Sequence, residues 1–214
     1  YNTGSNGTHN ISGSISGADE KKNFFFGLER FHTDGISAMS HNVEKDKYRN
    51  NSLVSKIEYE LNDSIDFFGS TRLTDTYLQY DKELNTSTAT HSEEVDEINS
   101  SSNIGLNYKL SDKFKNKISI AKTYIKRIYA ATPNSGNVAQ DNYYGDRYAL
   151  MYLGDYNFNL DNNIVFGYEE EYDEIGYNKD LTGKINKHNY VSSTFFDYQT
   201  RLTKNLYFTL GSRF

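Results

Sequence analysis

The fold of this 214-residue chain is clearest in nine consecutive residues, Leu53-Val54-Ser55-Lys56-Ile57-Glu58-Tyr59-Glu60-Leu61. Successive side chains of an extended strand point to opposite faces. One face of this stretch carries Leu53, Ile57 and Leu61, while Lys56 and Glu58 point the other way. Charged side chains at period two require contact with water, so the stretch predicts a strand between an apolar and an aqueous environment.

The same alternation recurs along the chain, in segments joined in turn by a tight polar turn and a long polar loop. The further segments with this pattern are His9–Ser16, Phe24–Thr33, Phe67–Tyr80, Asn103–Leu110, Ile118–Tyr124, Tyr148–Phe158, Ile164–Tyr172, Phe196–Leu202 and Leu206–Phe214. Long loops are expected at 34–52, 81–102, 131–145 and 178–189.

This pattern of alternating strands joined in turn by short turns and long loops is typical of bacterial outer-membrane barrels, which have short periplasmic turns and long extracellular loops. A strand that crosses a bilayer on a tilt needs only about 9 to 11 residues, with alternate side chains facing lipid and lumen. We therefore predict an all-β fold: an antiparallel transmembrane β-barrel segment of about ten long meandering strands.

The composition supports this fold and excludes two other classes of protein. Only 36% of the residues are hydrophobic and the mean hydropathy is −0.78, so no run approaches the roughly 18 apolar residues of a membrane-spanning helix. Nineteen tyrosines, thirteen phenylalanines and a single proline favour uninterrupted strands. A net charge of −6 argues against nucleic acid as a partner. The absence of cysteine fits an envelope protein without disulfides.

A soluble β-sandwich is the main alternative, because its strands also alternate. Sandwich strands are usually about 5 or 6 residues long, and their connections are not sorted into short and long classes. Aromatic residues gather at the strand ends, where a membrane interface favours them. They are Tyr77, Tyr80, Tyr143, Tyr144, Tyr148, Tyr172 and Tyr177.

Two motifs resemble a known family. The run Phe31-His32-Thr33-Asp34-Gly35-Ile36-Ser37-Ala38, followed by Glu44-Lys45-Asp46-Lys47-Tyr48-Arg49-Asn50-Asn51-Ser52-Leu53, resembles the first long barrel loop of TonB-dependent outer-membrane receptors, closest to the vitamin B12 (cobalamin) transporter branch. In that branch a DGISA run precedes E-x-D-G-Y-x-N-x-S-L, whose Gly is here replaced by Lys47. The closing Leu206–Phe214 resembles a mid-barrel strand of the same receptors.

The resemblance implies that residues 1–214 are a partial receptor barrel that lacks the plug domain and the later strands. The function implied is active import of a large scarce nutrient, cobalamin or alternatively an iron-siderophore, without catalysis or a required cofactor. The implied partners are outer-membrane lipid, the nutrient ligand and the TonB energy-transducing complex, which acts through the missing plug. The implied location is the outer membrane of a Gram-negative bacterium. A complete small barrel enzyme or adhesin is the alternative, because Phe214 follows a final alternating strand.

Three tyrosines are the candidate ligand-binding residues. Tyr143, Tyr144 and Tyr148 flank a long loop, and their flat faces could stack on a large planar ligand. The competing interpretation places them in the aromatic girdle of the membrane interface.

Acidic residues are the candidate metal ligands. The resemblance implies that Glu44 and Asp46 help to bind calcium and order the outer loops. Glu169, Glu171 and Asp173 share one face of a strand and are expected to line a hydrated lumen beside Lys or Arg of neighbouring strands.

His32 with Asp34, and His41 with Glu44, have the composition of acid–base pairs, since a carboxylate can orient an imidazole. Polar loops contain such pairs by composition alone, and no motif marks a nucleophile. We therefore predict that the chain is not an enzyme.

Overall fold

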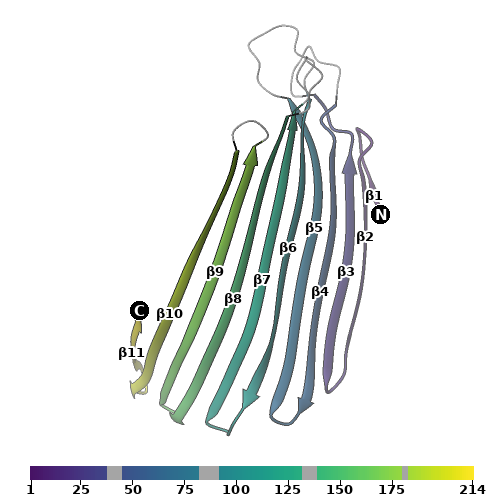
Figure 1. The fold of residues 1–214 in the computed structure, drawn as a ribbon. Helices are drawn as coiled ribbons and strands as arrows, with labels where there is room; N and C mark the ends of the chain where they lie inside the picture. Colours follow the sequence, from purple (N-terminus) through teal and green to yellow (C-terminus); the bar gives the residue numbers. More distant parts are fainter. Residues whose placement is uncertain (38–44, 82–91, 132–138, 180–182) are drawn as a thin grey trace.

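A computed structural model describes residues 1–37, 45–81, 92–131, 139–179 and 183–214. These residues form one antiparallel sheet of eleven strands, in which each strand pairs with the next along the chain (Figure 1). They contain no helix that is long and apolar enough to cross a membrane. The sheet is open in the described part of the chain, with β1 and β11 at its two edges. This architecture confirms the predicted all-β meander.

The strands are much longer than those of ordinary soluble sheets. Their bounds are β1 (Asn2–Thr3), β2 (His9–Ala18), β3 (Lys22–Thr33), β4 (Tyr48–Asn62), β5 (Ile65–Asp81), β6 (Ser92–Lys109), β7 (Phe114–Ala131), β8 (Ala139–Asn159), β9 (Asn162–Lys179), β10 (Gly183–Thr203) and β11 (Leu206–Arg213). Apart from the two-residue β1, ten strands remain, which agrees with the predicted number.

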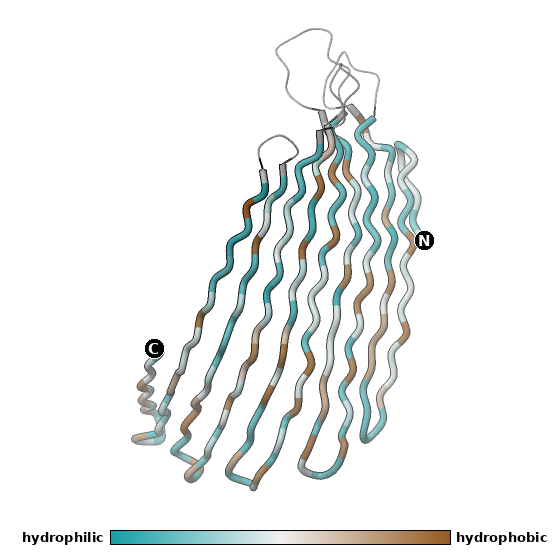
Figure 2. The backbone as a smooth tube through the Cα atoms, viewed as in Figure 1, coloured by the Kyte–Doolittle hydropathy of each residue, from teal (hydrophilic) through white to brown (hydrophobic). Residues whose placement is uncertain are grey.

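The strand register sorts the side chains onto two chemically different faces, because directly opposed residues of an antiparallel pair lie on the same face. The outer face carries exposed apolar side chains. Hydrophobic and hydrophilic residues alternate along the strands (Figure 2). These apolar residues are Ile11, Ile15, Phe24, Phe26, Leu28, Ile57, Leu61, Leu73, Ile104, Leu106, Ile118, Ile120, Phe196, Leu206, Phe208 and Leu210. The inner face is mostly polar, and includes Ser12, Lys56, Glu58, Arg72, Asn103, Lys117, Arg147, Glu169, Asp173 and Gln199.

The described sheet has almost no protein core. Val95 is the one hydrophobic residue in the described part of the chain that is buried, at 8% exposure. A soluble sandwich would cover its apolar face with a second sheet. No second layer covers the outer face among the described strands, so its apolar residues face the surroundings. This arrangement favours lipid contact over a sandwich.

On β3, β4 and β5, the apolar part of the outer face ends well below the loop end of the strands. Leu28, Leu53 and Leu73 oppose one another across β3, β4 and β5. The next outward row toward the loops is Arg30, Asn51 and Asp75. Strands β8 and β10 each have 21 residues, about 70 Å of extended chain. Because about 9 to 11 residues span a bilayer, we infer that the loop-side parts of the strands project beyond it.

The sequence overestimated the long loops. Residues 48–52, 92–102, 139–145 and 183–189, all expected to be loop, lie within strands. Apart from Val95, Ile98 and Ile185, these segments are mainly polar or aromatic on both faces. The alternation on which strand prediction depends is therefore absent there.

Candidate functional site

The candidate site is a cavity on the inner face, at the loop end of β5 to β10. Its volume is about 770 Å³. The side chains of the inner face that line it are Tyr80, Glu93, Ile125, Arg127, Tyr129, Asp141, Tyr143, Ile175, Tyr177, Ile185 and Lys187. They come from six neighbouring strands, so the cavity exists only because the strands pair in this register.

A row of three tyrosines in ring contact forms the centre of the cavity. Tyr143 on β8 lies directly opposite Tyr177 on β9, and their ring centroids are 4.5 Å apart. On the other side, Tyr129 on β7 contacts Tyr143 edge to face at 5.6 Å. We call Tyr129, Tyr143 and Tyr177 the tyrosine ladder. Offset and edge-to-face contacts are the favoured aromatic geometries, so the ladder is a rigid apolar surface.

Charged side chains surround the ladder. Arg127 donates from Nε to Glu97 at 2.6 Å and from a terminal nitrogen to the Tyr129 hydroxyl at 3.3 Å. The Tyr177 hydroxyl donates to Asp141 at 3.5 Å. Lys187 adds a second cation to the lining. The cavity can therefore place flat rings on the ladder and polar ligand groups on its rim.

Two tyrosine hydroxyls at the rim remain protonated at physiological pH. Tyr80 lies one residue before the end of β5 and donates to Glu93 at 2.7 Å. Burial, followed by the neighbouring Glu93 carboxylate, raises the pKa of Tyr80 to about 12. Tyr177, also beyond the apolar part of its strand, has its pKa raised to about 12 by burial and then by Tyr143 and Asp141. Each phenol donates its one hydrogen to a neighbouring carboxylate, so its oxygen can accept a hydrogen bond from a ligand.

The structure separates the three tyrosines that the sequence singled out. Tyr143 faces the cavity. Tyr144 and Tyr148 occupy the alternate positions of β8, on the outer face, and of these two only Tyr144 is among the residues that line the cavity. Lys122 lies over the Tyr148 ring, 4.8 Å from its centroid. Tyr172 lies next to Tyr148 on the same face, at 6.5 Å between centroids. This outward placement matches the girdle interpretation for Tyr148.

Sequence reasoning assigned Tyr80 and Tyr177 to the girdle and missed Tyr129 entirely. All three face inward with Tyr143. Alternate residues of one strand lie on the same face, and this can be read from the sequence. Which residues of two different strands share a face can be read only when the strand register is known.

The calcium candidates are only partly described. Glu44 lies outside the described residues, while Asp46 lies just before β4. Among the residues whose placement is described, no group of three or more His, Asp or Glu side chains could hold a metal ion. Calcium binding thus stays a prediction.

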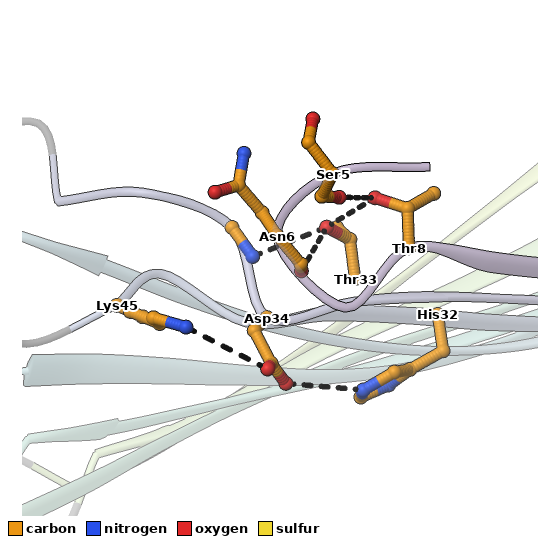
Figure 3. Close-up of polar contacts among 8 residues, drawn as sticks. Ser5, Asn6, Thr8, His32, Thr33, Asp34 and Lys45 are labelled. Atoms are coloured by element: carbon orange, nitrogen blue, oxygen red, sulfur yellow. Dashed lines mark hydrogen bonds and ion pairs between the residues drawn. The ribbon is translucent and has the colours of Figure 1, made fainter. Parts of the chain in front are cut away.

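The His32–Asp34 pair is present at the loop end of β3. His32 Nε2 lies 3.3 Å from the Asp34 carboxylate, and Lys45 Nζ lies 3.7 Å from the same carboxylate (Figure 3). Beside them, the Thr33 and Thr8 hydroxyls are 2.9 Å apart, and Thr8 donates to the Ser5 carbonyl at 2.7 Å. These contacts fasten the N-terminal turn to β3. His41 and Glu44, the second pair, lie outside the described residues.

The predicted pairing of the inner acidic row is confirmed for two of its members. Arg147 donates to Asp173 through two nitrogens, at 2.6 and 2.9 Å. Arg213 of β11 pairs with Glu169. These ion pairs join β8, β9 and β11 across the hydrated inner wall.

Comparisons with known proteins identify the fold. No family model and no curated protein matches the chain. Three solved structures share its architecture at 10–14% identity: the outer membrane transporter YddB from Escherichia coli, the RagAB peptide importer and the copper transporter OprC. Their TM-scores are 0.71, 0.68 and 0.68, and the matches cover 96%, 96% and 94% of this chain. The chain has the fold of an outer-membrane transporter barrel.

The chain spans only about a third of the length of these transporters, 33%, 31% and 36% respectively. The neighbours belong to the TonB-dependent outer-membrane transporters, and they are transporters rather than enzymes.

Proposed function

We propose that the chain forms part of the wall of a TonB-dependent outer-membrane importer, and that the cavity around the tyrosine ladder binds the imported nutrient. The observation that carries this proposal is the position of the ladder. Three tyrosines in ring contact face the interior at the loop end, on strand segments that extend beyond the apolar residues of the outer face. A ligand arriving from outside meets this surface before the membrane-spanning wall.

The proposed ligand is cobalamin, on the strength of the two sequence motifs. Its large ring system, with polar groups around the edge, suits a flat aromatic surface with a charged rim. An iron-siderophore is the alternative, because solved neighbours of this fold include the ferric citrate transporter FecA and the ferric preacinetobactin receptor BauA. Calcium bound near Glu44 and Asp46 would order the outer loops above the cavity.

The open sheet supports the proposal that the chain is one part of a larger barrel. An unpaired backbone group in hydrocarbon costs several kcal/mol, so a spanning sheet must close. In this proposal, further strands pair with the β1–β2 and β11 edges, and a plug domain outside the chain contacts the TonB complex.

Uptake in cells tests this function. The full-length protein that contains the chain is expressed in a Gram-negative host without its own cobalamin and ferric-chelate receptors. We expect uptake of labelled cobalamin that stops when a protonophore removes the energy source. Uptake of ferric chelates alone would favour the alternative ligand. Uptake of neither class, by a correctly assembled barrel, would contradict the importer assignment.

A further inference from the structure

We propose that the cavity around the tyrosine ladder continues into a second cavity, and that Gly145 and Lys187 select the ligand there by size and charge. Gly145 keeps the passage between the two cavities open. The Lys187 ammonium group binds an anionic side arm of the ligand, a phosphate or a carboxylate. The inference rests on the proposed function, because it concerns the imported ligand.

The second cavity, which we call the lower cavity, lies on the inner face of β7 to β10, on the side of the ladder away from the loops. Its volume is about 350 Å³. The inward side chains that line it are Thr123, Ile125, Arg147, Asp173, Ile175, Lys187 and Asn189. Two residues along a strand correspond to about 7 Å. The lower cavity therefore begins about 7 Å below Tyr143 and Tyr177.

The two cavities share part of their lining. Among the described residues, those that line both are Ile125, Gly145, Ile175 and Lys187. The strand pairing places these four residues in one row across β7 to β10, directly below the row that contains Tyr143 and Tyr177. A ligand that covers the ladder can therefore extend past this row into the lower cavity.

Gly145 determines the width of the passage. It lies between Ile125 and Ile175 in the register of the sheet. A Cβ atom at its position would be 3.2 Å from Ile125 Cγ2 and 3.8 Å from Ile175 Cγ2. A larger side chain would project into the space between the two isoleucines. The absence of a side chain therefore keeps the two cavities connected.

Lys187 gives the lower cavity its net positive charge. No described residue forms a hydrogen bond or an ion pair with its ammonium group. Arg147 and Asp173 offset each other, because the guanidinium group donates to both carboxylate oxygens. An ammonium group without a partner has three donors for an anionic group of a ligand.

Two carboxylates also border the lower cavity, but they belong to the outer face. Asp146 and Glu174 occupy alternate positions of β8 and β9, outside the inward rows. Asp146 pairs there with Lys122 at 3.3 Å, and Glu174 accepts a hydrogen bond from Asn186 at 2.9 Å. They therefore do not cancel the positive charge on the inner face.

The rim of the cavity around the ladder has acidic side chains instead. Glu93 and Asp141 line it and accept hydrogen bonds from tyrosine hydroxyls. Arg127, a cation of the same lining, pairs with Glu97. Like charges repel, so an anionic group is disfavoured at the rim and favoured beside Lys187. This difference orients the ligand, with its rings on the ladder and its anionic arm in the lower cavity.

Ligand binding by the full-length protein in mild detergent tests the charge selection. Titration calorimetry compares cobalamin, whose side arm carries a phosphodiester, cobinamide, which lacks that arm, and ferric citrate, which carries carboxylates. We expect cobalamin to bind about tenfold more tightly than cobinamide, because only its arm makes a charge-assisted contact. Lys187→Gln should remove this difference by weakening cobalamin alone. The matched control is Lys184→Gln, on the outer face of the same strand.

The size selection has its own pair of variants. Gly145→Val should weaken cobalamin about tenfold and leave cobinamide binding intact, since cobinamide has no arm to insert and also reports that the variant is folded. Gly27→Val is the matched control: this inward glycine lies on β3, away from both cavities, and its Cβ would be 3.1 Å from the Phe25 ring. It should leave the affinity for both ligands unchanged.

The outcomes separate the two proposals. Equal affinity for cobalamin and cobinamide, or equal weakening of both by Lys187→Gln, would overturn the inference and leave the proposed function intact. If ferric citrate alone binds, the arm is a carboxylate, and Lys187→Gln should weaken its binding about tenfold; unchanged binding would overturn the inference. Binding of none of the three ligands by a correctly assembled barrel would contradict the proposed function, and the inference with it.

Discussion

Tyr143 on β8 stacks on Tyr177 on β9 with an angle of 26° between the two rings. The two residues are 34 positions apart in the sequence, and the β8–β9 register brings them directly opposite each other. Tyr129 extends the contact to β7. An aromatic surface built by three strands is held in place by the sheet's own hydrogen bonds, so it requires little ordering when a ligand binds.

Removal of the central ring should weaken ligand binding. We expect Tyr143→Ala to reduce affinity for the imported ligand about tenfold, because truncation of an aromatic residue that a ligand covers commonly costs more than about 1 kcal/mol. Titration calorimetry on the detergent-solubilised protein measures this. Tyr124→Ala, on the outer face of β7, is the matched control. The same assay on Tyr144→Ala and Tyr148→Ala tests whether these two residues, predicted from the sequence, also bind the ligand. Equal affinity of Tyr143→Ala and the unmodified protein would exclude the tyrosine ladder as the binding site.

The two faces of β4 should respond oppositely to a new charge. Ile57 faces outward in the middle of the apolar segment, and Val54 faces inward. Ile57→Arg should destabilise the barrel in lipid vesicles by about 2–4 kcal/mol, whereas Val54→Arg should cost less than about 1 kcal/mol. Denaturant titration followed by heat-modifiable mobility provides the measurement. Comparable destabilisation by both substitutions would contradict the assignment of the faces.

One inward glycine leaves no room for a side chain. A Cβ at Gly167 would lie 2.5 Å from the Tyr152 carbonyl oxygen and would also overlap the Phe195 ring. Gly167→Ala should therefore cost about 1–3 kcal/mol of unfolding free energy through overpacking. Gly13→Ala, in open space, should stay within about 0.5 kcal/mol of the unmodified protein. An unfolding free energy of Gly167→Ala equal to that of the unmodified protein would contradict the described packing of β8 and β10 against β9.

The turn between β2 and β3 should depend on pH. The Asp19 carboxylate accepts hydrogen bonds from the backbone N–H groups of Lys21 and Lys22, at 2.9 and 3.0 Å. The Lys21 bond, and then the Lys22 contacts, lower the pKa of Asp19 below its usual value. Its stabilising effect is thus fully present above the unfolded-state pKa of about 3.9 and is lost as the pH falls through the folded-state pKa. The carboxyl carbon chemical shift measured against pH checks the direction, and a midpoint at or above the usual value would refute it.

The bidentate pair on the inner wall should contribute modestly. A double-mutant cycle on Arg147→Ala and Asp173→Ala should give a coupling of about 0.5–1 kcal/mol, because both side chains are partly exposed to water. Raising the salt concentration should reduce this coupling. Coupling well above this range, or insensitive to salt, would indicate that the lumen there is dry.

The sequence predicted the membrane-facing halves of the strands well and their loop-side halves poorly. Around Leu53–Leu61 one face is apolar and the other carries charged residues, so the pattern is strong. In Ala139–Gly145 both faces are outside the hydrocarbon, so residues there were assigned to a loop although they begin β8. The sequence identified Tyr143 as a candidate ligand-binding residue. It did not group Tyr143 with Tyr129 and Tyr177, because that grouping depends on how β7, β8 and β9 pair.

The order of residues alone determined the all-β class, the turn positions and the approximate number of strands, because period-two hydrophobicity and turn chemistry are local properties of the chain. Which tyrosines share a surface follows only from the pairing of the strands in the tertiary structure. Those relationships depend on register, and a shift of one residue between two strands would move every side chain of one strand to the opposite face of the sheet.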